Sequence, residues 1–269
     1  MAEVSILDYG IGNIGSILNM LRKLRVPAEA VSVRDSLRAA TRLILPGIGA
    51  FDACVTALEA SGLREDVLEF AASGRPLLGI CVGMQMLTLG SEEGNRPGLG
   101  LIRAQTRRFK PGAGLRIPHM GWDQVRWMLP EHPLARNLLD ENRFYFVHSF
   151  RVTCESPADS LAVCTYGEEF SAAIANRNVA GVQFHPEKSH RFGLQLLGNF
   201  ASARARFARA SSPACSLPAA SYSRLVASRT RCIWAIRSTP SSSSTTWTAT
   251  SSSWSTSGQQ SKGAGRTTP

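Results

Sequence analysis

The stretch from residue 76 to 87, Pro-Leu-Leu-Gly-Ile-Cys-Val-Gly-Met-Gln-Met-Leu, constrains the fold more than any other part of the chain. An apolar run at 77–80 is typical of a buried strand, and residues 84–89 begin a helical pattern. The G-x-C-x-G sequence at 79–83 predicts a sharp strand-to-helix turn, because a Cβ on either flank would collide within such a turn. This turn places Cys81 at a helix N-terminus, where backbone N–H groups favour a thiolate. The alternative is a buried structural cysteine between two unrelated glycines.

The rest of the first half alternates between strands and helices. Strands are predicted at 4–7, 30–33 and 41–45, and helices at 14–24, 51–60 and 63–72. This alternation predicts a parallel sheet with helices on both faces and functional residues at the carboxyl ends of the strands. From about residue 99 the pattern becomes β-rich, with strands predicted at 101–109, 124–128, 143–150, 161–166, 172–175 and 179–184 before a closing helix at 194–200.

Two glycine-rich segments follow predicted strands. Gly10, Gly12 and Gly15 match the G-x-G-x-x-G letters of a dinucleotide loop. No acidic residue ends the second strand, which is followed by Arg34, so we do not favour a dinucleotide site. The segment 46–51, Pro-Gly-Ile-Gly-Ala-Phe, leaves backbone N–H groups free to bind an anion or an oxyanion, and a plain turn is the alternative.

The composition favours a folded, cytoplasmic protein. Hydrophobic residues make up 43% of the 269 residues, which is enough for a core. The six cysteines contain no C-x-x-C pair or tight Cys/His cluster, so we expect no disulfide framework, no metal and no other cofactor. The N-terminus lacks a basic-then-apolar signal, and no apolar run of about 18 residues occurs, so no membrane association is expected.

The net charge of +10 is distributed unevenly along the chain. All 20 acidic residues lie within 1–200, and 201–269 contains nine of the 30 basic residues. The first 200 residues therefore carry a net charge of only +1, which gives no reason to expect nucleic-acid binding by this part. The sequence predicts a folded domain at 1–200 and a separate tail at 201–269.

The tail has the composition of a disordered segment. It contains 27 serines and threonines in 69 residues and no aspartate or glutamate. Segments such as 238–244 cannot bury enough apolar surface to fold. One explanation is a basic disordered arm that binds nucleic acid or another acidic surface. We favour the other explanation, a translation that has slipped frame near the end of the folded domain, because an unintended frame yields such a skewed composition.

A second chemical motif lies near the end of the folded domain, at Val182-Gln183-Phe184-His185-Pro186-Glu187. The residue before a proline favours an extended backbone, and residues two apart on an extended chain point to the same side. We therefore expect the Glu187 carboxylate to lie beside the His185 imidazole. Such a pair provides a base and the group that orients it, as a Cys81 nucleophile requires. A surface ion pair is the alternative.

Together these motifs resemble the class I (triad) glutamine amidotransferases. Cys81 within Gly-Ile-Cys-Val-Gly-Met-Gln and the run His185-Pro186-Glu187 carry the resemblance. Within this class, the chain is similar to the glutaminase subunits of imidazole glycerol phosphate synthases. That closer similarity covers roughly residues 3–200 and rests on four stretches, at 8–13, 118–122, 146–150 and 183–189.

The resemblance implies a flavodoxin-like, three-layer α/β domain with a mostly parallel central sheet and a β-rich second half. It also implies that Cys81 attacks the glutamine amide, that His185 moves the proton to ammonia, and that Glu187 orients His185. The oxyanion would be held by the N–H of Val82 and by an N–H from the loop Gly47-Ile48-Gly49. Four residues match glutamine-binding positions of the family, Glu93 at the α-amino group: Gln85, Glu93, Ser149 and Phe150.

The resemblance further implies a heterodimer with a (β/α)₈ cyclase subunit that receives the ammonia. Asn13, Trp122 and Lys188 match partner-facing positions. Asp123 stands where the family usually has Asn, and Phe150 stands where Tyr is usual. Two alternatives stay open: another class I glutaminase, serving pyridoxal phosphate or anthranilate synthesis, and a non-catalytic flavodoxin-like binding module.

Overall fold

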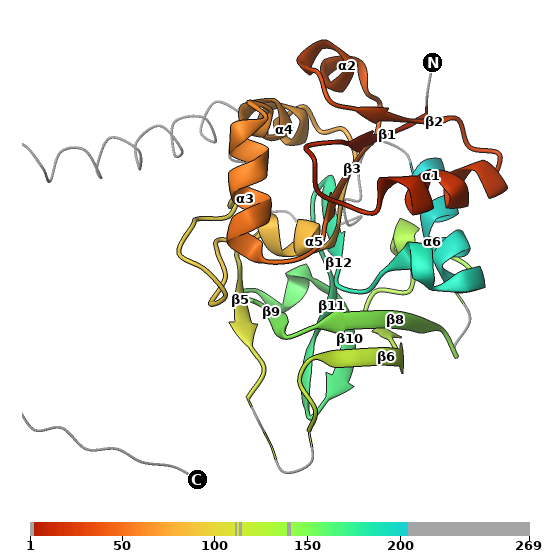
Figure 1. Cartoon of the computed structure of the whole chain (residues 1–269). Helices are drawn as coiled ribbons and strands as arrows, with labels where there is room; N and C mark the ends of the chain where they lie inside the picture. The colour runs from red at the N-terminus through yellow and green to blue at the C-terminus, as the bar shows by residue number, and fades with distance from the viewer. Residues whose placement is uncertain (1–2, 111, 113–114, 139–140, 204–269) are drawn as a thin grey trace, which may run out of the picture. The chain divides into compact units, whose positions relative to one another are not determined.

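A computed structural model of the chain describes residues 3–110, 112, 115–138 and 141–203 (Figure 1). The tail predicted at 201–269, with its predicted disorder and frame-slip origin, therefore lies outside the described residues from 204 onward. The rest of the chain is an α/β fold built on a mixed, mostly parallel central sheet, as predicted.

The large sheet has ten strands, and its main path runs in the order β2-β1-β3-β4-β12-β11-β10-β7. The first five strands of this path are parallel: β2 (Ala28–Val31), β1 (Val4–Leu7), β3 (Leu43–Gly47), β4 (Leu77–Cys81) and β12 (Val179–Val182). Antiparallel strands continue the sheet: β11 (Glu168–Asn176), β10 (Ser160–Tyr166), β7 (Arg126–Trp127), β9 (Phe150–Cys154) and β5 (Ala104–Arg108). A separate antiparallel pair joins β6 (His119–Gln124) to β8 (Arg143–His148).

Helices cover both faces of the parallel part (Figure 1). α1 (Ile14–Lys23) and α6 (His190–Ser202) pack together on one face, and α3 (Phe51–Ala60) and α5 (Val82–Met86) pack together on the other. Two further helices, α2 (Arg34–Ala39) and α4 (Arg64–Ala72), contact each other. Three short 3₁₀ turns complete the described elements: η1 (Pro133–Ala135), η2 (Pro157–Asp159) and η3 (Pro186–Lys188).

The parallel strands form the core because they are apolar on both faces. Every residue of β1, β3, β4 and β12 is buried, as expected for strands covered by helices on both sides. Their register aligns the carboxyl ends, since Gly47 pairs with Cys81 and Val182 pairs with Ile80. The segments that follow β3, β4 and β12 therefore meet at one edge of the sheet.

The boundaries predicted for the parallel half are close to those observed, with three differences. β2 lies at 28–31 rather than 30–33, and α2 was not predicted. The helix after the G-x-C-x-G turn begins at Val82 and ends at Met86, rather than running through 84–89. It begins early because Cys81, with φ 56°, reverses the chain within a single residue.

The second half differs more from the prediction. The strand predicted at 124–128 is two strands, β6 and β7, and β6 already begins at His119. β9 was not predicted at all. The final strand stops at Val182 rather than at Phe184, and the closing helix α6 begins at His190, before the predicted start at 194.

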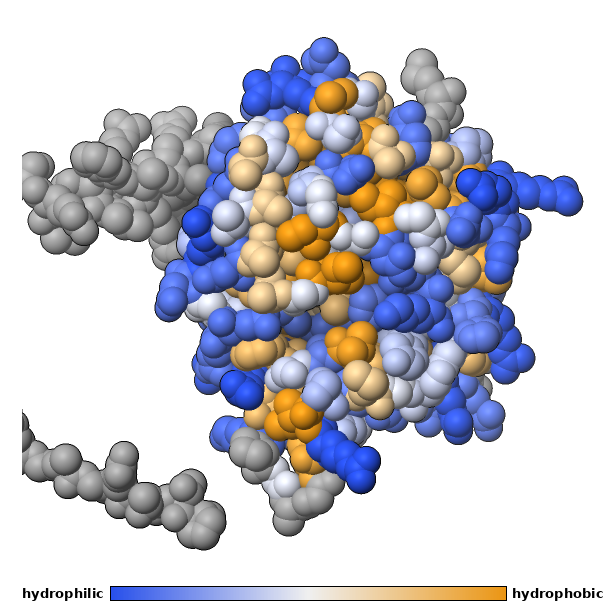
Figure 2. Space-filling view, viewed as in Figure 1, coloured by the Kyte–Doolittle hydropathy of each residue, from blue (hydrophilic) through white to orange (hydrophobic). Residues whose placement is uncertain are grey.

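The surface carries both apolar and charged regions. On the face drawn in Figure 2, hydrophobic residues gather over the middle of the molecule and hydrophilic residues surround them. Among the described residues, five large hydrophobic side chains are exposed: Val33, Ile48, Met120, Trp122 and Met128. Within the described part of the chain, none of the helices has the length and apolar character needed to cross a membrane.

Candidate active site

Cys81 lies at the tip of a strained turn between β4 and α5. It adopts φ 56° and ψ −115°, a conformation that residues with a side chain rarely occupy. The turn is closely packed, because a Cβ on Gly79 would lie 2.6 Å from the carbonyl oxygen of Gly83, and one on Gly83 would overlap the carbonyl oxygen of Leu45. Both glycines of G-x-C-x-G are therefore required sterically, as the sequence predicts.

The loop that follows β3 lies directly against this turn. Gly47 pairs with Cys81 in the sheet, and a Cβ on Gly47 would overlap the backbone of Val82 and Gly83. Gly49 adopts φ +84°, which residues with a side chain seldom adopt. The structure thus brings the predicted oxyanion loop and the N-terminus of α5 together beside one nucleophile.

His185 follows β12, and its Nδ1 lies 2.8 Å from Oε1 of Glu187. The two side chains are only 3% and 1% exposed, so the pair is shielded from solvent. The predicted proximity is present, and His185 itself is extended as predicted, with φ −99° and ψ 98°, but the extended backbone does not continue past it. Residues 186–188 form the 3₁₀ turn η3, which brings the Glu187 carboxylate back to the imidazole.

Burial and hydrogen bonding oppose each other at His185. Burial by itself lowers the pKa of the imidazole, whereas its hydrogen bonds with Cys81 and Glu187 raise it, and the net result is a pKa of about 9. The imidazole is therefore protonated at neutral pH. A thiolate–imidazolium pair is the form in which a cysteine is a ready nucleophile and the histidine a ready acid.

Asn13 contacts the same carboxylate. It occupies the N-cap position of α1, but its side chain makes no capping hydrogen bond. Instead, Nδ2 donates to Oε1 of Glu187 at 3.5 Å. The other Glu187 oxygen, Oε2, is buried without a hydrogen-bond partner among the described residues. Asn13, matched from the sequence to a partner-facing position, therefore also lies next to the His185–Glu187 pair.

A pocket of about 430 Å³ opens in front of Cys81 and His185. It brings together the four residues matched to glutamine-binding positions and two of the expected oxyanion residues. Its lining includes Gly49, Val82, Gln85, Glu93, Ser149 and Phe150, with Lys188 at its edge. Glu187 lies behind His185 and does not line it. The size and the polar groups suit a small amino acid.

Glu93 is held in place at the rim of this pocket. Its Oε2 accepts a hydrogen bond from the backbone N–H of Phe51 at 2.8 Å, at the start of α3. This contact positions a carboxylate at the pocket, where it can attract a cationic group of a ligand.

Gln183 is a residue of this site to which the sequence analysis assigned no role. It is completely buried, its Nε2 lies 3.9 Å from Sγ of Cys81, and its Oε1 accepts from Nε2 of Gln85 at 3.1 Å. Gln85 is itself 2% exposed. A signal was present in the sequence, because Gln183 is a polar residue that directly follows the apolar run of β12, two residues before His185.

His148 was missed as well. It is buried in the pocket wall, with Nε2 3.0 Å from Nδ1 of His119 and Nδ1 2.7 Å from the carbonyl oxygen of Phe150. Burial lowers the pKa of His148 to about 3. It is therefore neutral and does not compete with His185 for a proton.

Trp122 and Lys188 lie on one surface beside the pocket. The Trp122 ring, which is 45% exposed, lies 6.1 Å from the Tyr145 ring and 5.2 Å from the His190 ring. Nζ of Lys188 lies 5.6 Å from the centre of the Tyr145 ring. Two of the three predicted partner-facing residues thus share Tyr145 as a common neighbour.

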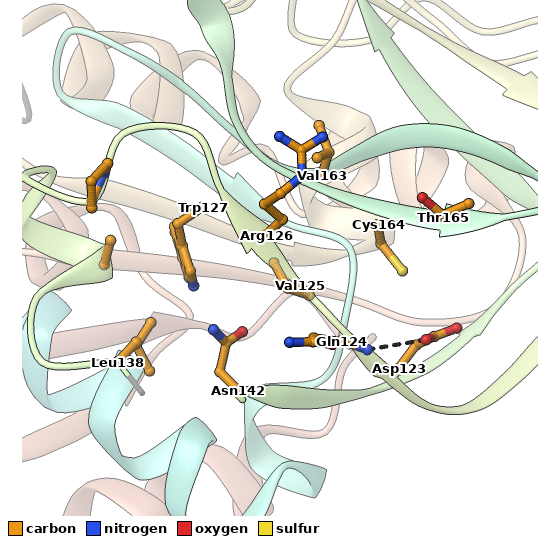
Figure 3. Close-up of a pocket in the computed structure, with 12 residues that line it drawn as sticks. Asp123, Gln124, Val125, Arg126, Trp127, Leu138, Asn142, Val163, Cys164 and Thr165 are labelled. Atoms are coloured by element: carbon orange, nitrogen blue, oxygen red, sulfur yellow. Dashed lines mark hydrogen bonds between the residues drawn. The ribbon is translucent and has the colours of Figure 1, made fainter. Parts of the chain in front are cut away.

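A larger pocket of about 610 Å³ lies elsewhere, between residues 123–127 and β10 (Figure 3). Its hydrogen bond drawn in Figure 3 joins the N–H of Gln124 to Oδ1 of Asp123. Burial raises the pKa of its one cysteine, Cys164, to about 12. That thiol stays protonated and has no imidazole beside it in the pocket lining, so this pocket lacks the chemistry found at Cys81. No group of three His, Cys, Asp or Glu residues in the described part is arranged to hold a metal.

Comparison with known proteins decides the class. A family model described as glutamine amidotransferase class-I matches residues 5–203. The chain belongs to the class I glutamine amidotransferases. This class consists of glutaminases that use a Cys-His-Glu triad, so the enzyme class predicted from the sequence is confirmed.

Individual relatives span almost the same part of the chain. This amidotransferase is 48% identical over 198 residues to the imidazole glycerol phosphate synthase subunit HisH 2 of Pseudomonas aeruginosa, a match that covers 73% of this chain and 98% of the relative. It is also 48% identical over 201 residues to the subunit HisH of Bdellovibrio bacteriovorus, with the same coverage.

Solved structures support the fold alone. The crystal structure of a putative GMP synthase protein from Thermoplasma acidophilum superposes with a TM-score of 0.56 at 21% identity, covering 83% of this chain and 96% of that one. The structure of PurLQS from Thermotoga maritima superposes with a TM-score of 0.57 at 18% identity, covering 73% of this chain and 96% of that one.

Proposed function

We propose that Cys81, His185 and Glu187 form the triad with which this chain hydrolyses glutamine to glutamate and ammonia. The chain is a glutaminase subunit of imidazole glycerol phosphate synthase, in histidine biosynthesis, because relatives of that name are 46–48% identical to it over 98% of their length. The observation that carries the triad is the protonated, buried His185–Glu187 pair beside a cysteine on a strained turn.

Each triad residue has one chemical task. Nδ1 of His185 is bound to Glu187, which leaves Nε2 to serve the nucleophile. The Cys81 thiolate attacks the side-chain amide carbon of glutamine, the carbon–nitrogen bond breaks, and His185 gives its proton to the departing ammonia. Water then attacks the thioester and passes a proton to His185, and glutamate leaves as the thiolate re-forms.

The negative charge that develops on the amide oxygen requires hydrogen-bond donors. Val82 supplies the N–H that follows the nucleophile, at the start of α5. The loop Gly47-Ile48-Gly49 supplies a second N–H, and the pairing of Gly47 with Cys81 supports this assignment. Each such donor contributes about 10²–10³ to the rate in comparable enzymes.

The pocket residues recognise the ends of glutamine. Glu93, fixed by the N–H of Phe51, binds the α-ammonium group. Gln85, Ser149 and Phe150 line the same pocket and contact the rest of the substrate. Phe150 provides its ring and backbone without the hydroxyl that the family usually has at this position.

The ammonia passes to a partner subunit, a (β/α)₈ cyclase that forms a heterodimer with this chain in the cytoplasm. The cyclase combines it with a phosphoribulosyl substrate to give imidazole glycerol phosphate and an aminoimidazole carboxamide ribotide. Asn13, Trp122 and Lys188 form the docking surface. Two observations support it: Trp122 is exposed, and Lys188 connects this surface to the glutamine pocket.

The decisive experiment replaces the nucleophile. Cys81→Ala in the complex with the cyclase should abolish glutamine-dependent synthesis and leave synthesis from added ammonium salts intact, because the partner's chemistry does not use Cys81. Cys164→Ala is the matched control, since it removes an equally buried thiol from β10. Glutamine turnover by Cys81→Ala within about tenfold of the parent would contradict the triad, since a nucleophile normally contributes far more.

A further inference from the structure

Tyr9 lies beside the predicted oxyanion loop. It follows β1, which pairs with β3, and it is only 6% exposed. Its hydroxyl donates a hydrogen bond to the carbonyl oxygen of Pro46 at 2.6 Å. Pro46 immediately precedes the loop Gly47-Ile48-Gly49, so Tyr9 holds the peptide through which the chain enters that loop.

Cys54 holds the other side of the same loop. It lies in α3 and is completely buried. Its thiol donates to the carbonyl oxygen of Ile48 at 3.2 Å. Cys54 thus fixes the peptide that joins Ile48 to Gly49.

The two side chains also contact each other. Burial and this contact raise the pKa of the Tyr9 hydroxyl, and burial raises the pKa of the Cys54 thiol. Both groups therefore stay protonated at neutral pH and keep donating to the loop. Neither is exposed, and neither lines the glutamine pocket.

We infer that Tyr9 and Cys54 are positioning residues for the oxyanion loop, acting as a clamp on the two peptides that flank the Gly47–Ile48 peptide. This inference rests on the function proposed above for the loop. Gly47 cannot shift toward the nucleophile, because it already lies against the backbone of Val82 and Gly83. Because the carbonyls of Pro46 and Ile48 are both held by hydrogen bonds, rotation within the loop is restricted to the Gly47–Ile48 peptide between them.

The clamp has a kinetic consequence. A donor contributes to catalysis only when it is held where the oxyanion forms, and its complete loss costs about 10²–10³ in rate. A loop released on one side still presents its N–H for part of the time, so the cost should be smaller, about tenfold in kcat. Glutamine binding should be unaffected, because the clamp touches none of the residues that bind it.

The test uses the full chain in complex with the cyclase subunit. We expect Tyr9→Phe and Cys54→Ala each to lower kcat for glutamine about tenfold with KM within about twofold, because only the transition state uses the oxyanion donor. Cys54→Ser should regain most of the lost rate, since its hydroxyl can donate to Ile48. Synthesis from ammonium salts and the rate at which iodoacetamide alkylates Cys81 should not change.

The double variant and a matched control separate a clamp from a general packing role. Tyr9→Phe combined with Cys54→Ala should cost less than the product of the single effects, because both act on one loop. Cys164→Ala should leave kcat at the parent value.

Parental kcat in Cys54→Ala, or equal losses in Cys54→Ala and Cys54→Ser, would overturn the clamp. If Tyr9→Phe fails to fold, the comparison of Cys54→Ala with Cys54→Ser still tests the clamp. The function proposed for the site is judged separately, by Cys81→Ala, so a failed clamp and a failed triad give different results.

Discussion

The parallel and antiparallel parts of the sheet make different contributions to one site. The parallel part supplies the groups proposed to react, each at the carboxyl end of a strand: the loop that begins at the end of β3, Cys81 at the end of β4 and His185 after β12. The antiparallel part supplies Ser149 and Phe150, which line the proposed glutamine pocket. The proposed chemistry therefore depends on the alignment of buried strands, and the proposed recognition combines Gln85 of α5 and Glu93 with a wall from the antiparallel part.

Burial differs between the candidate site and the surface of the antiparallel part. Cys81 and His185 are 4% and 2% exposed, whereas Met120 and Trp122 on β6 are 61% and 45% exposed. Burial holds Cys81 and His185 in a fixed geometry. Exposed apolar side chains in the other part remain available for contact with another protein.

The largest predicted effect is in the parallel part, where His185→Ala removes the base itself. We expect a loss of about 10³-fold or more in glutamine turnover, and a smaller loss for Glu187→Gln, which changes only the orientation of the imidazole. The pH dependence of kcat gives a second readout. The His185 pKa is raised to about 9, so the proton needed by ammonia is lost and the rate falls above that pH.

Glu187→Gln removes one of the groups that raise this pKa. The basic limb of the kcat profile should therefore move to lower pH in this variant. Turnover equal to that of the parent, with an unshifted profile, would show that Glu187 does not orient His185.

Replacing a glycine by alanine should destabilise the protein more in the parallel part than in the antiparallel part. Gly83→Ala places a methyl group of α5 against the Leu45 carbonyl of β3, a strand held on both sides by β1 and β4, and we expect a loss of about 3 kcal/mol or more in the free energy of unfolding. Gly167→Ala, at the turn between β10 and β11, meets only the end of the Leu115 side chain. Its φ of +71° should cost about 1 kcal/mol.

Urea titration measures the loss in the free energy of unfolding for each of the two variants. Equal midpoints for Gly83→Ala and Gly167→Ala would mean that the nucleophile turn is less tightly packed than the structure shows.

The exposed surface of the antiparallel part should matter for association and not for folding. Trp122→Ala should weaken binding of the cyclase by about 2 kcal/mol, because exposed aromatic residues often dominate an interface. Val33→Ala is the matched control, since it removes an exposed apolar side chain from the parallel part. Titration calorimetry with the purified cyclase measures the affinity of each variant. Identical affinities for Trp122→Ala and Val33→Ala would show that Trp122 does not belong to the docking surface.

The smallest effect is expected from removing the tail. Residues 204–269 lie outside the described residues, and the last described helix is α6, whose Leu196, Leu197 and Phe200 are fully buried. A chain ending near residue 205 should therefore fold, bind the cyclase and turn over glutamine like the full chain. Loss of cyclase binding on trimming would make the tail functional, and resequencing the DNA around codons 195–215 tests the frame-slip explanation.

Sequence reasoning succeeded where local chemistry determines local structure. β1, α3 and the G-x-C-x-G turn lie where they were predicted, because continuous apolar runs and glycine turns carry their own signal. It failed for α2, which buries only Leu37 and so shows no helical periodicity. It also failed for β9, where the sequence Phe-Arg-Val-Thr-Cys alternates between apolar and polar residues, so the signal of a half-buried strand was present and was missed.

The sequence by itself determined the class of chemistry, because the turn around Cys81 and the pair His185–Glu187 are each encoded within a few residues. Only the tertiary structure decided what surrounds them. Gln183 reaches Cys81 across 102 residues, and Tyr9 reaches Pro46 across 37. Such contacts arise from the order and register of strands, which depend on the packing of the whole core and leave no local pattern in the chain.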